Sequence, residues 1–412
     1  MPRHMVARAG LLFLLLIATY LLLGWVAFLV PDWRVQHQVS QTRYIGDLLH
    51  DDYPKAILFD DLHAQDRYTL DNFTDALMVD QALSLRSEGL KGILLLPRYE
   101  WPGATMCDNI GHLLAGDDGG RRVFYGRYWH GSTFVARILL ATMNFLELRY
   151  LLYVLSSLLG LWCLVRLWRK ASPLAALSLA LALLAVGVYV MQFSLQFAPV
   201  LLIALAAIVW MTYRPAMSTA QGGLLFFAVG SLTAYFDLIT VPSLSLGLPL
   251  VAWVALRNDD AWRRPILDIL VLALWWLAAY LLTWLAKWGL ASALTDYNIF
   301  SDAYGEADKW SQGGSAYLAD AFSSCFAKVQ WLYIALPAAV LVVLACLRPR
   351  RRWAQAAQFA LVALVPLVYY LLMPHPAAHH SWFNYRALAV TLAALLAALA
   401  SLVDWHRLTH KQ

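Results

Sequence analysis

Charged residues are scarce in this chain. Only 14% of its 412 residues are Asp, Glu, Lys or Arg, whereas 61% are hydrophobic. Soluble domains carry roughly a quarter charged residues, so the composition excludes an ordinary water-soluble fold and predicts a polytopic membrane protein. The net charge of +5 does not predict a nucleic-acid partner, because the basic residues concentrate in short segments between apolar runs.

Familiar nucleotide-binding and catalytic motifs are also missing. The sequence contains no Walker loop, no dinucleotide-binding fingerprint, no HExxH and no GxSxG. The segments expected on the cytoplasmic side are too short to hold a nucleotide-binding domain. We therefore expect any activated substrate to arrive through the bilayer.

Long apolar runs fill most of the remaining chain. A transmembrane helix needs roughly 17–25 mostly apolar residues, and about ten such segments are expected here. Their approximate cores are residues 11–30, 148–167, 175–191, 197–213, 222–235, 240–256, 266–284, 329–347, 356–373 and 387–403. With the N-terminus in the cytoplasm, every short inside segment carries Lys or Arg, while the first outside loop is richer in Asp and Glu. This alternation favours an even number of spans with both ends inside.

The predicted architecture is an all-α polytopic membrane protein with a mixed α/β periplasmic loop domain after the first helix. Its expected parts are a signal-anchor helix (1–30), a first extracytoplasmic loop (31–147), helices two to seven (148–287), a second extracytoplasmic loop (288–328) and helices eight to ten (329–412) with a His-rich and aromatic loop (374–386). Within the first loop, 56–59 and 92–96 resemble strands, and 73–85 is amphipathic. A loop of this size is more than a connector, so we expect the chemistry there.

Two pairs of carboxylates in the first loop are candidate general bases. Asp71 and Asp75 are four residues apart and share one face if their segment is helical. Two close carboxylates raise the pKa of one of them, as a hydroxyl-activating base requires. A solvated acidic helix face is the alternative. Asp60 and Asp61 form a second candidate pair, with a turn as the alternative.

The heptapeptide YGRYWHG, residues 125–131, is the most unusual segment of the chain. Arg127 suits recognition of a phosphate. Tyr125, Tyr128, Trp129 and His130 suit stacking on a sugar. Interfacial anchoring would explain Tyr and Trp, but it does not explain Arg and His between glycines.

Ionisable residues near the outer ends of later spans are further candidates. Asp237 lies where the fifth span should emerge, and a turn role is its alternative. His380 and Arg386 precede the last span together with Tyr385. Arg386 suits a phosphate, although it could also extend to the interface. The paired histidines lack an acidic neighbour at metal-ligand spacing.

The overall pattern resembles the GT-C class of integral-membrane glycosyltransferases. The segments LDNFTDALM, YGRYWHG, AYFDLITVPSLSLG and HHSWFNYR resemble parts of bacterial multispanning proteins encoded among surface-glycan genes. The size and residue usage also resemble a pilin arabinosyltransferase of pseudomonads. The resemblance implies a polyprenyl-phosphate sugar donor and an acidic base in the first loop, which falls on Asp75, with Asp71 or the Asp60–Asp61 pair as substitutes. Many members carry adjacent acids straight after the first span, whereas Asp32 stands alone here.

The resemblance implies a complete set of roles. The base would deprotonate an acceptor hydroxyl on a surface glycan, a cell-wall polymer or a pilin. The donor phosphate would bind Arg127, Arg386, Lys328 and His380. Sugar and acceptor would contact Tyr125, Tyr128, Trp129, His130, Asp237 and Tyr385. A divalent cation, Mg²⁺ or Mn²⁺, serves some members and not others, and these residues do not decide. The expected location is the bacterial inner membrane, with the site facing the periplasm.

Three other functions remain open from the sequence. An O-antigen ligase or polymerase would carry its large loop late in the chain. A lipid-linked sugar transporter or flippase would need charges deep within several spans, and only Asp268 approaches this. A noncatalytic scaffold would leave the YGRYWHG segment unexplained.

Two cysteines fall in the expected outside loops. Cys107 lies in the first and Cys325 in the second. Disulfides persist in an oxidising periplasm, so a Cys107–Cys325 bridge is predicted to fasten the two loops. Two separate thiols are the alternative, because a bridge needs Cα atoms within about 7 Å.

Overall fold

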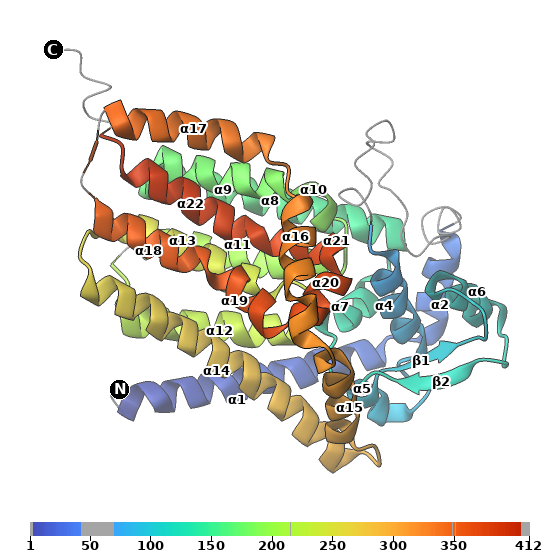
Figure 1. Cartoon of the computed structure of the whole chain (residues 1–412). Coiled ribbons are helices and arrows are strands. Elements are labelled where there is room, and N and C mark those ends of the chain that lie inside the picture. The colour runs from blue at the N-terminus through green and yellow to red at the C-terminus, as the bar shows by residue number, and fades with distance from the viewer. Residues whose placement is uncertain (1–2, 43–69, 215, 348, 351, 405–412) are drawn as a thin grey trace.

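The structure, a computed structural model, describes residues 3–42, 70–214, 216–347, 349–350 and 352–404. It is a bundle of long helices with a group of shorter helices and two small strands at one end (Figure 1). The predicted all-α class is confirmed. The candidate acids Asp60 and Asp61, with the strand-like run 56–59, lie outside the described residues.

The bundle consists of apolar helices that follow the predicted runs. They are α1 (Arg3–Leu29), α8 (Phe145–Lys170), α9 (Pro173–Ala185), α10 (Val188–Met191), α11 (Phe197–Tyr213), α12 (Thr219–Phe236), α13 (Pro242–Arg257), α14 (Arg263–Leu294), α17 (Leu332–Leu347), α18 (Trp353–Ala363), α19 (Val365–Leu372) and α22 (Ala389–Ser401). Among the described residues, five helices are long and apolar enough to cross a membrane, or six if a pair bent by 84° counts as one. Three shorter apolar helices accompany them. The arrangement agrees with a polytopic membrane protein.

Close approach of helices holds the bundle together. α12 and α14 pack along much of their length. At Gly230 of α12, an added Cβ would collide with the main-chain carbonyl of Trp276 on α14. Small residues at such crossings let apolar helices gain dispersion contacts that lipid would otherwise supply. Gly230 therefore sets the spacing of these two helices.

The first loop folds as a mainly helical unit. Its elements are α2 (Asp32–Gln41), α4 (Asn72–Ser84), η2 (Gly89–Lys91), α5 (Gly92–Leu95), β1 (Pro97–Glu100), α6 (Met106–Ala115), β2 (Arg121–Phe124) and α7 (Gly131–Leu139). The strands form one antiparallel pair, with Pro97 opposite Phe124. The run 73–85 forms helix α4, but α4 is buried on nearly all sides and is not amphipathic as expected. The strand expected over 92–96 is wrong. Short apolar runs suit either conformation, and this one packs as a helical turn against Ala291 and Ile299.

A buried arginine fastens the first loop to the end of α1. Arg137 of α7 is fully buried. Its guanidinium donates to the carbonyls of Ala27 at 2.9 Å, Val30 at 2.7 Å and Ala82, and it pairs with Asp32 at 2.5 Å. A cation at the carboxyl end of a helix is favourable because the unpaired carbonyls there carry partial negative charge. This contact fixes the direction in which the chain leaves α1.

The second outer region and the last loop cover the same end of the bundle. They comprise α15 (Ile299–Ser311), η3 (Gly314–Tyr317), α16 (Leu318–Ala327), α20 (Pro374–His379), α21 (Ser381–Asn384) and η4 (Tyr385–Leu388). α16 packs against α20 and α21. Trp310 of α15 contacts the rings of His375, His379 and His380. These contacts place the last loop beside the second outer region.

The predicted Cys107–Cys325 disulfide is wrong. Cys107 lies in α6 and packs in the core of the first loop. Cys325 lies in α16, buried in the separate core of the helical bundle, where its Sγ is 3.7 Å from the carbonyl oxygen of Ala377. Both thiols are buried in the reduced form, because each helix turns its cysteine into its own apolar core.

Candidate functional site

Asp75 anchors the first loop to the bundle. Its carboxylate receives bonds from Arg149 of α8 at 2.7 and 3.1 Å, the amide of Leu195 at 3.0 Å and the hydroxyl of Ser194 at 3.3 Å. The Asp75 side chain has no exposed surface, and that of Arg149 is 2% exposed. A carboxylate with four donors has little capacity left to accept a substrate proton. The geometry thus gives Asp75 a positioning role.

Asp71, one helical turn earlier, has unused bonding capacity. Its side chain caps the first turn of α4 by accepting from the amide of Thr74 at 3.1 Å. Its second oxygen, Oδ2, is buried without a hydrogen-bond partner. Burial raises the pKa of Asp71 to about 7; the Thr74 bond and Arg386 lower it, and the charge of Asp75 raises it further. Such a group can take up a proton near neutral pH.

Arg386 lies close enough to Asp71 to interact with it electrostatically. The guanidinium is fully buried in η4, immediately before α22, and stands 5.2 Å from the ring of Phe197. Its Nη1 atom donates to the carbonyl of Trp382 at 3.4 Å, while Nε and Nη2 have no partner. Unsatisfied buried charged groups are costly and call for an explanation. Arg386 and Asp71 are thus two buried ionisable groups, each with unused hydrogen-bonding capacity.

The YGRYWHG segment forms an aromatic cluster against α14. The ring of Tyr128 lies 5.6 Å from Tyr125, 5.9 Å from His130 and 5.4 Å from Trp284 of α14. His130 has φ of 56°, a left-handed conformation that few non-glycine residues adopt, and its Nε2 lies 3.0 Å from the carbonyl oxygen of Tyr125. Burial lowers the pKa of His130 well below its ordinary value, so the ring is neutral. Trp129 is buried and donates to the carbonyl of Thr283 at 2.7 Å.

Arg127 connects the first loop to α15 rather than facing an open site. Its guanidinium lies 3.3 Å from Asp302 and 3.4 Å from Glu306, and it stacks on Tyr125 at 4.3 Å. Both acids belong to α15. The charge of Arg127 is therefore already balanced, unlike that of Arg386.

The remaining predicted residues lie around this end of the bundle. Asp237 accepts bonds from the amide and hydroxyl of Thr240 at 3.2 and 2.5 Å, which is the turn role named as its alternative. Tyr385 precedes Arg386, whose guanidinium lies 5.1 Å from the Tyr385 ring. His380 stacks on Phe383 at 5.1 Å, and burial lowers its pKa to about 4. Lys328 ends α16.

Two buried cations were missed from the sequence. Arg149 lies at the start of α8, where it pairs with Asp75. Lys287 of α14 is fully buried and donates to the carbonyl of Leu94 at 2.8 Å while lying 5.4 Å from the Trp129 ring. Arg149 lies at the start of the predicted span 148–167, and Lys287 lies just after the predicted span 266–284; at such positions Lys and Arg ordinarily mark topology. Their burial depends on partners from the first loop, which span prediction does not consider.

Within the described ranges, no group of three or more His, Cys, Asp or Glu is arranged to hold a metal ion. Of the predicted residues, the structure brings together Asp71 and Arg386, which interact electrostatically, and Tyr385, whose ring Arg386 contacts. Tyr125, Tyr128 and His130 form a separate aromatic cluster in the first loop. Compared with protein-family models, curated proteins and solved structures, the chain has no significant match.

Proposed function

We propose that the chain is a membrane-embedded glycosyltransferase that moves a sugar from a polyprenyl-phosphate donor to an extracytoplasmic acceptor. One observation carries the proposal. A buried carboxyl with an unpartnered oxygen, Asp71, lies within electrostatic range of a buried guanidinium with two unpartnered nitrogens, Arg386. Glycosyl transfer from a phosphate requires such a pair: one group to accept a proton and one to hold an anion.

The proposed reaction is a single displacement. The acceptor hydroxyl attacks the anomeric carbon as Asp71 takes its proton. The new C–O bond forms while the bond between the anomeric carbon and the phosphate oxygen breaks, and polyprenyl phosphate leaves with the electron pair. Arg386 stabilises the negative charge on the leaving phosphate through Nε and Nη2. Relative to the resemblance, the base moves from Asp75 to Asp71.

An aromatic row on α14 supports an amphipathic donor. Trp276, Tyr280, Trp284 and Trp288 follow one another at every fourth residue, with ring centroids 4.9, 5.6 and 5.6 Å apart. The hydroxyl of Tyr280 and the Nε1 atom of Trp284 are buried without partners. Aromatic faces suit both an isoprenoid chain and a sugar ring, while the polar atoms suit sugar hydroxyls. The row reaches Tyr128, so it links the bundle to the YGRYWHG segment of the first loop.

We also propose the number of transmembrane spans and their orientation. Ten spans with both ends in the cytoplasm would put α4, α7, α15 and η4 on the periplasmic side of a bacterial inner membrane. The basic segments at the opposite end of the bundle favour that orientation.

Mass spectrometry of surface glycans and pilins tests the function. A deletion strain should lose one sugar substituent, and the wild-type gene should restore it whereas Asp71→Asn should not. Asp268→Asn serves as an expressed control outside the site. An unchanged glycan and pilin profile in the deletion strain would contradict the proposal, and accumulation of lipid-linked sugar on the cytoplasmic side would favour a flippase.

A further inference from the structure

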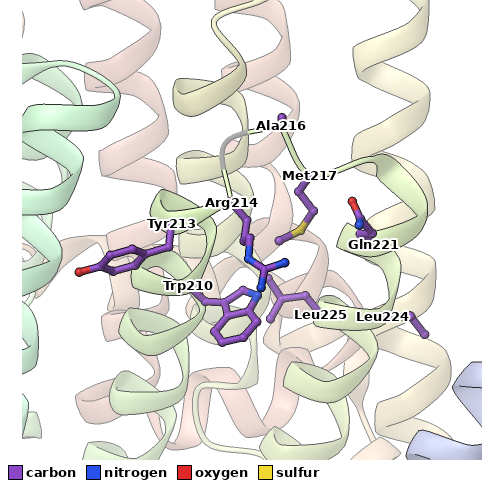
Figure 2. A pocket seen from close by; sticks show the side chains of 8 residues that line it. All are labelled: Trp210, Tyr213, Arg214, Ala216, Met217, Gln221, Leu224 and Leu225. Carbon is purple, nitrogen blue, oxygen red and sulfur yellow. The ribbon is translucent and has the colours of Figure 1, made fainter.

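A pocket opens at the end of the bundle opposite Asp71 and Arg386. It lies between the end of α11 and the start of α12 and is lined by Trp210, Tyr213, Arg214, Met217, Leu224 and Leu225, among others (Figure 2). α11 begins at Phe197, beside Arg386, and has 17 residues. At 1.5 Å per residue, the pocket is about 25 Å from the candidate site. It therefore belongs to the other membrane face.

The pocket combines an apolar wall with a single charge. Figure 2 shows the Arg214 side chain directed toward Trp210, with Met217 and Leu225 nearby. The Arg214 guanidinium lies 5.6 Å from the Trp210 ring. Among the described residues, no acidic side chain lines this pocket. An anion would therefore meet an uncompensated positive charge at the edge of an apolar surface.

Two further arginines strengthen the positive potential. Arg166 of α8 stacks on Tyr213 at 3.8 Å and donates to Thr212 at 3.1 Å. Arg257 of α13 donates to the carbonyl of Met217 at 2.5 Å. Each guanidinium thus contacts a residue in or next to the pocket wall. Trp210 and Tyr213 are both 54% exposed, which is typical of aromatic residues at a membrane–water interface.

We propose that this pocket binds an anionic phospholipid of the surrounding leaflet, with its phosphodiester on Arg214 and its acyl chain along Trp210, Leu224 and Leu225. The charge favours an anion, and basic pockets between transmembrane helices on the cytoplasmic side suit anionic head groups. The apolar wall favours a lipid over a soluble phosphate. The lipid would join α11 to α12 where the chain between them is short.

Native mass spectrometry of the full-length protein tests this inference. The purified protein is titrated with phosphatidylglycerol or phosphatidylcholine of identical acyl chains. We expect one phosphatidylglycerol to be retained at least about tenfold more tightly than phosphatidylcholine, a difference of about 1.4 kcal/mol. Arg214→Gln should abolish that preference. Arg169→Gln is the matched control, because Arg169 is an exposed residue in the last turn of α8 that does not line the pocket.

Two outcomes would overturn the inference. One is an equal preference for phosphatidylglycerol in wild type and Arg214→Gln. The other is displacement of the bound lipid by glycerol 3-phosphate at equal concentration, since the site would then recognise a soluble anion. A second variant, Leu224→Gln, should weaken lipid retention without altering the melting temperature of the delipidated protein. Unchanged retention in Leu224→Gln would refute the apolar part of the site.

Discussion

At the scale of single residues, two aspartates one helical turn apart have different surroundings. Asp75 is held by Arg149, Leu195 and Ser194, whereas Asp71 keeps an oxygen without a partner. The spacing predicted that the two acids would influence each other, and the charge of Asp75 does raise the pKa of Asp71. The sequence could not predict which acid keeps an oxygen free to accept a proton. The donors that occupy Asp75 come from α8 and from the segment before α11, far away in the sequence.

Replacing Asp71 with Asn should nearly abolish sugar transfer. The rate should fall roughly 10²–10⁴-fold, the usual contribution of a general base. Asn can still cap α4, so the melting temperature should not fall. Asp75→Asn is the informative contrast, because removing one member of a buried ion pair should destabilise the fold by about 3–5 kcal/mol. Transfer rates and thermal unfolding of both variants distinguish the roles, and full activity in Asp71→Asn would reject Asp71 as the base.

The pH dependence of transfer should follow the carboxyl of Asp71. A base works in its deprotonated form, and the pKa of Asp71 is raised to about 7 by burial. The rate at low donor concentration should therefore rise between about pH 6 and pH 8 and then level off. Arg166→Gln, remote from the site, should keep the same profile. A rate that is constant across this interval would contradict a base with a raised pKa.

Replacing Arg386 with Gln should weaken donor binding. Loss of a buried charged hydrogen bond costs about 2–5 kcal/mol, so the apparent donor affinity should fall at least about thirtyfold. The buried guanidinium has two nitrogens without partners, hence Gln should not destabilise the free protein. Donor titration measures the effect, with Arg127→Gln as the comparison because Arg127 is already paired with α15. Equal affinity in wild type and Arg386→Gln would remove the phosphate-binding role.

At the scale of helices and strands, the apolar runs predicted where elements lie better than whether a short element is a helix or a strand. The long runs became helical, because apolar backbone in a membrane satisfies its hydrogen bonds internally as helix. Their limits were predicted less well: 175–191 is divided between α9 and α10, 356–373 between α18 and α19, and 266–284 belongs to the longer α14. The run 92–96 became α5, and a strand formed instead at Pro97–Glu100, opposite β2. Whether a short segment becomes a strand depends on pairing with a partner strand. For β1 that partner, β2, lies more than twenty residues away in the sequence.

Adding one methyl group at Gly230 should destabilise the bundle. The new Cβ of Gly230→Ala would collide with the carbonyl of Trp276. Overpacking of this kind costs about 1–3 kcal/mol, so the melting temperature should fall. Gly160→Ala on α8 is the control, because its nearest neighbour would be Leu205 at 3.9 Å. Equal melting temperatures for the two variants would show that α12 and α14 are not packed closely at this glycine.

At the scale of the whole molecule, segments far apart in the sequence meet at one end of the bundle. The first loop, α15 and the chain before α22 all contribute there (Figure 1). Composition predicted which loops would face one side of the membrane, but it could not predict the contacts between them. Arg127 was assigned to a substrate phosphate and instead pairs with Asp302 and Glu306, because acids of the second outer region lie within its reach.

Separating these two outer regions should increase the motion of α15. Arg127→Ala removes the ion pairs with Asp302 and Glu306. Amide hydrogen exchange in 299–311 should become faster, while exchange within α12 and α14 should not change. Arg121→Ala is the control, since its pair with Glu100 stays within the β1–β2 pair and its side chain is 78% exposed. Unchanged exchange in α15 would show that Arg127 does not restrain it.

The distance along the chain between Asp71 and Arg386 has a consequence for biosynthesis. Asp71 caps the first turn of α4 in the first loop, and Arg386 lies in η4, the turn before the last helix, α22. During translation, the early carboxyl must wait for nearly the whole polypeptide before its cationic neighbour is made. A ribosome that stops before the final hairpin thus releases a product with an intact outer loop and no complete site. Under the proposed mechanism, the two residues would couple activity to completion of synthesis, and truncated copies in the membrane would be inert.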